Sequence, residues 1–296
     1  LPEPLLVAPE PFDELAEEWA AQHAAVPGAT VFTHPRWHAA WLRHFGAGTE
    51  PLFLAFRDDD DLVGVAAMDL AGPVARTLGD HNVRDYGGPL ARPGDEARVF
   101  SALLEFLRED TTRELELWGV PGGDPIVAAA AREASDQGWS FASEVEAVSP
   151  FAALPASFDD YVQGLSKKDR HELRRKMRNL DAAGEVRYEA WSGPEAIDRI
   201  DGLLALMRAS RSDKDEFLTP PMEAFFRDLV TEFAPLEMAA IGALHLDGRA
   251  AAMLLTFEGE GATLLYNSGY DPDLAHLAVG LISKAAAIRR AIETGK

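Results

Sequence analysis

The sequence contains no cysteine, so disulfide bonds and thiol nucleophiles are excluded. It has no apolar run long enough to span a bilayer. Its start, Leu1-Pro2-Glu3-Pro4, lacks the basic residues and apolar stretch of a signal peptide. Basic residues are scarce, because 28 Lys and Arg stand against 49 Asp and Glu, for a formal net charge of −21. We therefore expect a cytoplasmic protein that makes no broad contact with DNA or anionic membranes.

Several motifs that carry chemistry are also missing. The sequence has no P-loop, no glycine fingerprint for a dinucleotide and no Gly-x-Ser-x-Gly elbow, which disfavours a kinase, a dehydrogenase and a serine hydrolase. His34 and His38 have the i, i+4 spacing of a metal site. However, His34 precedes a proline, and no carboxylate follows in the pattern of a zinc protease. We expect no metal.

What the chain does have is one basic segment. Residues 166–178 contain seven Lys and Arg against two acidic residues, a charge of +5, so the remainder of the chain carries −26. Ser166 and Asp169 have the spacing of a capping box, and an apolar stripe follows, which predicts a helix. At about 100° per residue, one narrow face of this helix would carry four basic side chains: Lys167, His171, Arg174 and Arg178.

Three interpretations of this face remain open. It could be an ordinary solvated charged surface, which is the usual role of a charge run. It could bind an anion, since cations near a helix N-terminus add to the positive end of the helix dipole. It could also contact nucleic acid, which the acidity of the rest of the chain disfavours. On the second interpretation, we expect the four side chains to line a cleft between two domains and to hold a phosphate or carboxylate.

At 296 residues, with 47% hydrophobic residues, the chain is long enough for two domains with separate cores. The helix and strand pattern restarts near Ser149-Pro150, which predicts α+β domains at residues 1–149 and 150–296. In the first domain we expect helices at 12–25, 35–45, 95–108 and 124–137, and strands at 52–56, 62–70, 114–118 and 139–148. In the second we expect helices at 158–165, 166–183, 194–210, 221–233 and 276–292, and strands at 186–190, 236–246, 250–258 and 262–268. The acidic turn at 58–61 predicts a hairpin in the first domain, and the turns at 247–248 and 259–261 predict a three-strand meander in the second.

Four segments, in this order, resemble motifs of the GNAT superfamily, and more closely of its FemAB-like and CelD-like (cellulose biosynthesis) acyltransferases. The first three are Phe32–Trp37, similar to F-x-x-P-x-W, Asp85–Leu90, similar to D-Y-x-x-P-L, and Phe158–Arg178, similar to F-x-x-Y-x-x-x-L-S-x-x-x-R-x-x-x-R-R. The fourth is Tyr266–Asp271 with Gly280 downstream, similar to Y-x-S-G-Y-D…G. Ala278-Val279 stand where the family often has Ser-Pro.

The resemblance implies tandem GNAT-like domains, each a mixed, mostly antiparallel sheet flanked by helices. It also implies acyl transfer to an amine or a hydroxyl, with acetyl-CoA or another acyl-CoA as co-substrate. In GNAT folds the donor's pyrophosphate binds backbone N–H groups at the start of a helix after a central strand. In this chain that place is the helix start at 273–280, with Ala278, Val279 and Gly280 as the candidate residues. The alternative is an ordinary capped helix in which Gly280 serves packing, since Asp271 and Asp273 would face the pyrophosphate.

Further candidate site residues follow from the resemblance. Tyr266 and Tyr270 flank the passage from strand to helix, where a leaving thiolate needs a proton. His276 could serve as a base or as a phosphate contact, although a lone histidine is more often neither. Asp85 and Tyr86 lie in a glycine-rich turn of the first domain that could line a cleft. For each tyrosine, the alternative is a half-buried ring whose hydroxyl is satisfied elsewhere.

Three functions are compatible with these residues. The first is an acyltransferase from acyl-CoA to an amine or sugar hydroxyl, with a small molecule or a cell-envelope or polysaccharide precursor as acceptor. The second is a Fem-type ligase that takes an aminoacyl group from tRNA, although the charge of −21 argues against extensive tRNA contact. The third is a GNAT-fold module that binds a precursor or a partner without catalysis.

Overall fold

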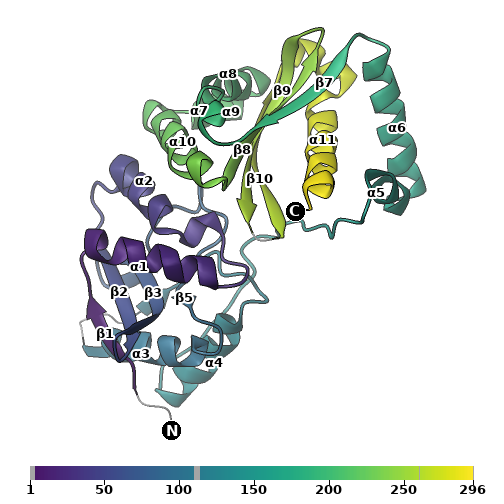
Figure 1. Cartoon of the computed structure of the whole chain (residues 1–296). Coiled ribbons are helices and arrows are strands. Elements are labelled where there is room, and N and C mark those ends of the chain that lie inside the picture. Colours follow the sequence, from purple (N-terminus) through teal and green to yellow (C-terminus); the bar gives the residue numbers. More distant parts are fainter. Residues whose placement is uncertain (1–3, 110–113, 260, 296) are drawn as a thin grey trace. The chain divides into compact units, whose positions relative to one another are not determined.

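The computed structural model describes residues 4–109, 114–259 and 261–295. Contacts divide the chain into two compact units, Leu1–Ser149 and Pro150–Lys296. Each unit consists of one sheet with helices packed on it (Figure 1). This confirms the predicted α+β class with two sheets flanked by helices. Within the described residues, no helix combines the length and apolar character needed to cross a membrane.

The first unit contains a six-stranded sheet with the order β1-β2-β3-β4-β6, and β5 pairs with β3. The β4–β6 pair is parallel and the other pairs are antiparallel, so the sheet is mixed as expected. Its strands are β1 (Leu6–Pro9), β2 (Pro51–Asp58), β3 (Asp61–Asp69), β4 (Val74–Thr77), β5 (Leu90–Ala91) and β6 (Glu114–Glu116). Its helices are α1 (Phe12–Ala25), the 3-10 turn η1 (Val31–Thr33), α2 (Pro35–Phe45), α3 (Glu96–Glu109) and α4 (Pro125–Asp136).

The predicted hairpin of the first unit is present. Asp58 pairs with Asp61, and Asp59 adopts a left-handed conformation with φ of 53°, which a short polar side chain tolerates in a tight turn. By contrast, the strand predicted at 139–148 is wrong, because these residues have no regular structure. Val145 and Val148 are each 83% exposed. A strand needs a neighbour for its backbone groups, and no described strand pairs with this segment.

The second unit contains a four-stranded sheet with the order β10-β9-β8-β7, and all of its pairs are antiparallel. Its strands are β7 (Val186–Trp191), β8 (Ala239–Leu246), β9 (Arg249–Gly259) and β10 (Ala262–Tyr270). Its helices are α5 (Phe158–Gly164), α6 (Lys167–Asp181), α7 (Pro194–Ile197), α8 (Ile200–Ser210), α9 (Ser212–Phe217), α10 (Pro220–Phe233), η2 (Ala234–Leu236), η3 (Pro272–Leu277) and α11 (Val279–Thr294).

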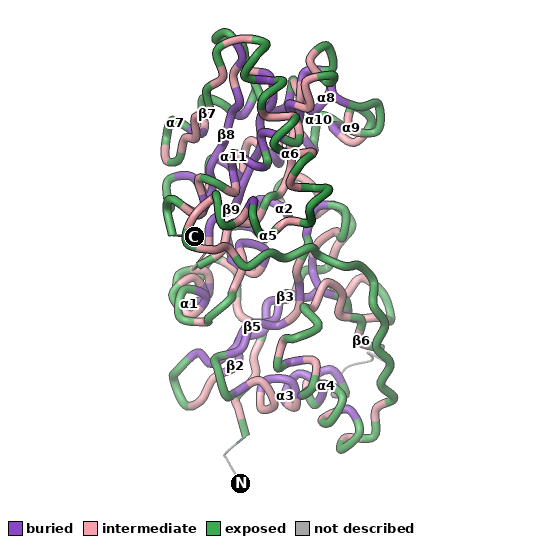
Figure 2. Tube along the Cα trace, turned by 90° about the vertical axis from the view of Figure 1, so that its right-hand side faces the viewer, coloured by how far each residue is buried: buried purple, intermediate pink, exposed green. Residues whose placement is uncertain are grey.

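The helices of the second unit form two layers. Helices α5, α6 and α11 cover one face of the sheet, and α7 to α10 cover the other (Figure 1). The middle strands β8 and β9 are buried along most of their length (Figure 2). Two predicted helices differ from the observed ones. A turn at Asp198-Arg199 divides 194–210 into α7 and α8, and the last helix begins at Val279 because Ala278 is left-handed, with φ of 58°.

Candidate functional site

An open pocket lies where the edge strand β10 leads into α11. Its volume is about 320 Å³. Helix α11 forms one wall, the junction of α8 and α9 forms the other, and the end of β10 forms the floor. The lining residues are Ser210, Arg211, Lys214, Ser268, Tyr270, Ala275, Ala278, Gly280, Leu281 and Lys284.

The shape of this end of the sheet depends on Gly269. A Cβ atom at Gly269 would lie 2.2 Å from the backbone nitrogen of Met207 in α8, so only glycine permits the helix to approach the strand this closely. A β-bulge between Leu265 and Asn267 distorts β10 just before this contact. Beyond the contact, the chain leaves α8 and turns into α9, which brings Arg211 and Lys214 to the pocket.

Lys214 is fixed inside the pocket. Its ammonium group donates to the side-chain oxygen of Asn267 at 2.9 Å and to the backbone carbonyl of Ser268. Partial burial lowers the pKa of Lys214, and the positive charges of Lys284 and Arg211 lower it further. Three cations therefore converge at one point of a strongly acidic chain. Arg211 also pairs with Asp213 at 2.8 Å, and a bound anion would offset the repulsion that remains among the three cations.

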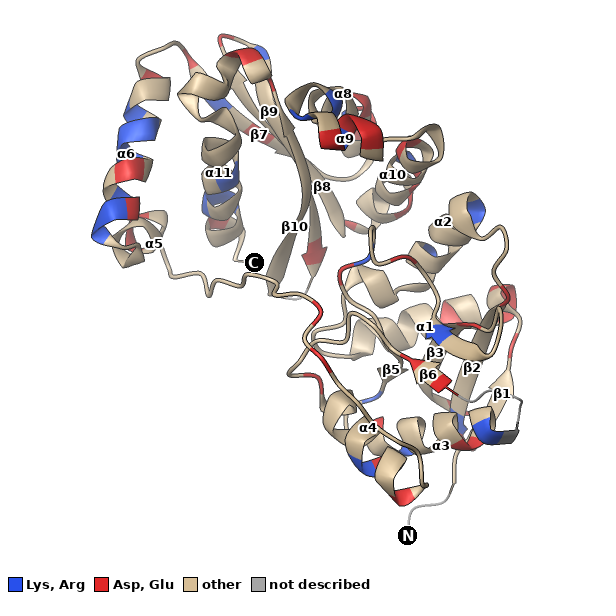
Figure 3. Cartoon of the chain, turned by 180° about the vertical axis from the view of Figure 1, so that it is seen from behind, with Lys and Arg blue, Asp and Glu red and all other residues tan. Residues whose placement is uncertain are grey.

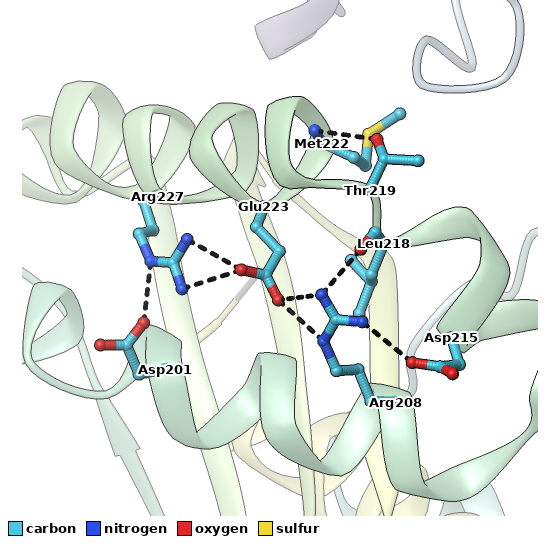
Figure 4. Close-up of polar contacts among 8 residues, drawn as sticks. All are labelled: Asp201, Arg208, Asp215, Leu218, Thr219, Met222, Glu223 and Arg227. Atoms are coloured by element: carbon cyan, nitrogen blue, oxygen red, sulfur yellow. Dashed lines mark hydrogen bonds and ion pairs between the residues drawn. The ribbon is translucent and has the colours of Figure 1, made fainter.

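An ion-pair network holds the short helix α9 in place (Figure 4). Arg208 donates to Asp215 of α9 at 2.9 Å, to Glu223 of α10 at 2.6 Å and to the carbonyl of Leu218 at 2.8 Å. Glu223 also pairs with Arg227, which in turn bonds Asp201 of α8. This network joins α8, α9 and α10, and thereby fixes the helix that carries Lys214.

The start of α11 supplies backbone donors to the same pocket. The N-terminal N–H groups of a helix have no partner within the helix, and no side chain caps α11. Ala278 and Gly280 keep this end uncrowded, and the Cα of Gly280 faces the ring of Tyr270, which an added Cβ would approach to 3.2 Å. The nearby carboxylate of Asp271 does not line the pocket. It is buried and paired with Arg249, and it accepts from the Asp273 N–H at 3.0 Å.

The structure brings together only part of the predicted catalytic set. Tyr270 lines the pocket beside Ala278 and Gly280. Tyr266 points to the opposite face of the sheet, where its ring lies 5.5 Å from Phe226 and 5.1 Å from Phe257. His276 is exposed in η3, with Nδ1 3.1 Å from the carbonyl of Asp273, and it is not among the pocket's lining residues. Val279 is fully buried, so only its backbone can contribute to a site.

The basic face of α6 is present as a helix surface (Figure 3). The capping box forms, because the hydroxyl of Ser166 accepts from the Asp169 N–H at 3.1 Å and donates to the Asp169 carboxylate at 2.7 Å. Glu172 pairs with Arg175 and Lys176, which lie outside the predicted face. Within the described part of the chain, no acidic side chain pairs with Lys167, His171, Arg174 or Arg178, and all four are exposed.

The predicted residues of the first unit are held by a buried arginine. The guanidinium of Arg84 is inaccessible to solvent, donates to the carbonyls of Tyr86 at 2.8 Å and Leu78, and lies over the ring of Trp118. Burial lowers the pKa of Arg84 to about 9. The Tyr86 hydroxyl donates to the Ser149 hydroxyl at 2.7 Å, and Asp85 is exposed. Arg84 thus fixes the turn that presents Asp85 and Tyr86.

His34 and His38, which have the spacing of a metal site in the sequence, make other contacts in the structure. His34 is the N-cap of α2, where its Nδ1 accepts from the Arg36 N–H at 3.2 Å. His38 is buried, with its ring centroid 5.0 Å from that of Trp19. Among the described residues, no cluster of three His, Asp or Glu side chains could hold a metal.

Sequence reasoning missed the three cations of the pocket. Lys214 lies in Ser-Asp-Lys-Asp-Glu, which is typical of a solvated acidic helix, and Lys284 lies seventy residues away in an alanine-rich helix. No sequence pattern links these cations, because it is the contact of α8 with Gly269 that brings them into one pocket.

Comparisons with known proteins concern the family and the fold. Residues 167–295 match the family model of the acetyltransferase (GNAT) domain. Comparison with curated protein sequences gives no match. Among solved structures, FemX is similar over 98% of this chain and 86% of its own, with a TM-score of 0.66 and 11% identity.

Two further structures share the fold. A conserved protein of unknown function from Bacteroides thetaiotaomicron has a TM-score of 0.57 at 14% identity, over 97% of this chain and 86% of its own. The C-terminal domain of a putative lysylphosphatidylglycerol synthetase from Agrobacterium fabrum has a TM-score of 0.52 at 11% identity, over 95% and 76%. At these identities the similarity concerns the fold alone. Residues 167–295 therefore form a GNAT-type acetyltransferase domain by family match, and the chain as a whole shares the fold of FemX.

Proposed function

We propose that this protein transfers an acyl group, with an acyl-CoA such as acetyl-CoA as donor, to an amine or a sugar hydroxyl. The observation that carries the proposal is the convergence of Arg211, Lys214 and Lys284 at the uncapped start of α11 in a GNAT domain. Side-chain cations and helix N–H groups directed at one point form a site for phosphate. The donor's pyrophosphate is the group that would bind there.

Acyl transfer itself needs few further groups in the pocket. The acceptor nitrogen or oxygen attacks the thioester carbonyl carbon, and the tetrahedral intermediate expels the CoA thiolate. The proton lost by the acceptor ends on the thiolate sulfur. Tyr270 lines the pocket beside the start of α11, and we assign its hydroxyl to pass that proton. Tyr266 and His276 are no longer our candidates, because Tyr266 faces the opposite side of the sheet and His276 does not line the pocket.

We propose that the acceptor binds to the exposed cations of α6. Lys167, His171, Arg174 and Arg178 have no acidic partner among the described residues, so a phosphate of a cell-envelope or polysaccharide precursor could bind them without breaking an ion pair. A cytoplasmic location would suit this type of acceptor.

A second candidate is a Fem-type ligase that uses aminoacyl-tRNA. The fold shared with FemX and the basic face of α6 favour it. The net charge of −21 opposes it, because tRNA binding depends on many phosphate contacts. A third candidate is a GNAT-fold module that binds without catalysis.

Two experiments separate these candidates. A thermal-shift screen compares acetyl-CoA, longer acyl-CoAs, nucleotide-sugars and aminoacyl-tRNA, since a ligand of the native state raises the melting temperature. A thiol-release assay then follows CoA formation with amine and sugar acceptors. The proposal predicts a shift with an acyl-CoA and acceptor-dependent release of thiol. A shift with tRNA alone supports the ligase, and a shift without turnover of any acceptor supports the binding module.

A further inference from the structure

A second pocket lies on the other side of α11, away from Lys214 and Lys284. It is a groove of about 200 Å³ between α6 and α11, above strands β7 and β8. Its walls are Met177 and Leu180 of α6 and Ile282 and Ala286 of α11, and Leu244 of β8 lies in its floor. None of the residues named for the acyl-transfer site lines it, so this groove is a separate feature of the unit.

One arginine that lines the groove has no acidic partner among the described residues. The guanidinium of Arg289 lies 4.3 Å from the ring centroid of Phe158 and, within the described part of the chain, pairs with no carboxylate. Its neighbour Arg290 differs, since it pairs with the buried Glu258 at 3.0 Å. In a chain with a charge of −21, an arginine left without an acidic partner beside an apolar groove is suited to an anionic ligand.

The floor of the groove offers one polar group. Tyr188 projects across the sheet so that its hydroxyl lies over Gly242, where an added Cβ would come within 2.1 Å of the oxygen. Within the described residues this hydroxyl makes no hydrogen bond to a side chain. Burial raises the pKa of Tyr188 to about 12, so the hydroxyl remains a donor at physiological pH.

The charges around the groove are unequally distributed. Asp181 also lines it, at the end where α6 finishes. Arg289 lies seven residues beyond Ile282 on α11, which is about 10 Å along a helix. The side of α6 next to the lining stripe carries the exposed cations Arg174 and Arg178. Positive charge therefore predominates at the rim, and the space between the ends of the groove is apolar.

We propose that the groove between α6 and α11 binds an anionic amphiphile of the fatty-acid type, with its alkyl chain on the apolar walls and its carboxylate on Arg289. The apolar lining would bind the alkyl chain of the ligand, and the arginine without an acidic partner would bind its carboxylate head group. The site is independent of the acyl-transfer pocket, so it can be tested without any measurement of turnover.

The test is calorimetric titration of the full chain with octanoate, octanol and octylamine. Octanoate is expected to bind more tightly than octanol, and octylamine not to bind. Across fatty acids of increasing length, affinity should rise by up to about fourfold per methylene until the groove is filled. This series uses the unaltered protein, so it stands even if a variant fails to fold.

Two variants locate the ligand. Ala286→Trp fills the groove and is expected to abolish octanoate binding. Arg289→Gln should weaken octanoate by about tenfold and leave octanol unchanged. Lys176→Gln, which removes a charge from another face of α6, is the control and should change neither. Equal binding of octylamine and octanoate, or octanoate binding that survives Ala286→Trp in a folded protein, would overturn the proposal, as would the absence of any binding.

Discussion

The ammonium group of Lys214 lies 2.9 Å from the side-chain oxygen of Asn267, and this contact joins α9 to the bulged part of β10. Asn267 also accepts from the Ser268 N–H at 3.0 Å, so one amide side chain organises both the strand and the lysine. The cation is therefore positioned before any ligand arrives, which reduces the entropy that binding must overcome.

Because of Lys214, the affinity for the donor should begin to fall at a lower pH than it would with a lysine of ordinary pKa. Burial and its cationic neighbours lower its pKa from the usual 10.5. The charged form binds phosphate, so acetyl-CoA affinity should decline as pH rises through this lowered pKa. Calorimetric titration with acetyl-CoA between pH 7 and 10 measures this decline in affinity. Lys214→Arg, which stays charged throughout this range, should remove the decline, and an unchanged pH profile in that variant would count against the assignment.

Gly269 should tolerate no side chain. Gly269→Ala places a Cβ 2.2 Å from the backbone of α8, and the strand or helix must move. We expect a loss of stability of about 1–3 kcal/mol, measured by urea unfolding. Gly259→Ala is the control, because its Cβ meets no atom closer than 3.9 Å. Equal stability of the two variants would show that the approach of α8 to β10 is not tight.

Arg174 should contribute to binding of a phosphate-bearing acceptor. With UDP-N-acetylglucosamine as the probe, Arg174→Ala is expected to weaken binding about tenfold, because one charge-assisted contact is lost. Added salt should weaken binding to the unaltered protein further. Lys176→Ala, which removes a cation paired with Glu172, should have little effect. If both variants behave alike, the face of α6 is an ordinary solvated surface.

Acid should destabilise the first unit before the second. Burial lowers the pKa of His23 and His38, and lowers that of His34 to about 3. These rings are neutral when folded, so their contribution to stability is complete above pH 6.5 and is lost as pH falls toward their lowered pKa values. For His34, whose pKa of about 3 lies far below this range, the loss between pH 6.5 and 5.5 is about 1 kcal/mol.

Tryptophan fluorescence can follow this loss, since Trp191 is the only one of the six tryptophans in the second unit. His38→Leu should reduce the acid sensitivity of urea unfolding. His81→Leu, at an exposed position, should leave it unchanged. Acid sensitivity that is the same in both variants would mean that other groups are responsible.

Local sequence patterns predicted most of the elements. The capping box of α6, the acidic hairpin between β2 and β3 and the meander of β8 to β10 all depend on neighbours in the chain, and all are present. The failed strand at 139–148 shows the limit of such patterns. Alternation indicates which side chains could share a face, but a strand also needs a partner far away in the sequence.

The site was less predictable for the same reason. The resemblance to GNAT motifs pointed to the start of α11, and Tyr270 and Gly280 line the pocket there. The cations come from elsewhere, since Lys214 reaches the pocket only through the Arg208 network and the close approach at Gly269. Tyr266 and Tyr270 look equivalent in the sequence, yet they lie on opposite faces because of the bulge between Leu265 and Asn267.

The most direct test of the account is calorimetric titration of acetyl-CoA into the unaltered protein and into Arg211→Gln/Lys214→Gln/Lys284→Gln. We predict one binding site in the unaltered protein, and a loss of affinity of about a hundredfold or more in the triple variant, because several charge-assisted contacts to phosphate are lost. Circular dichroism should show that both proteins are folded. Absence of binding to the unaltered protein would contradict the proposed function, and equal binding by a folded triple variant would contradict the proposed site.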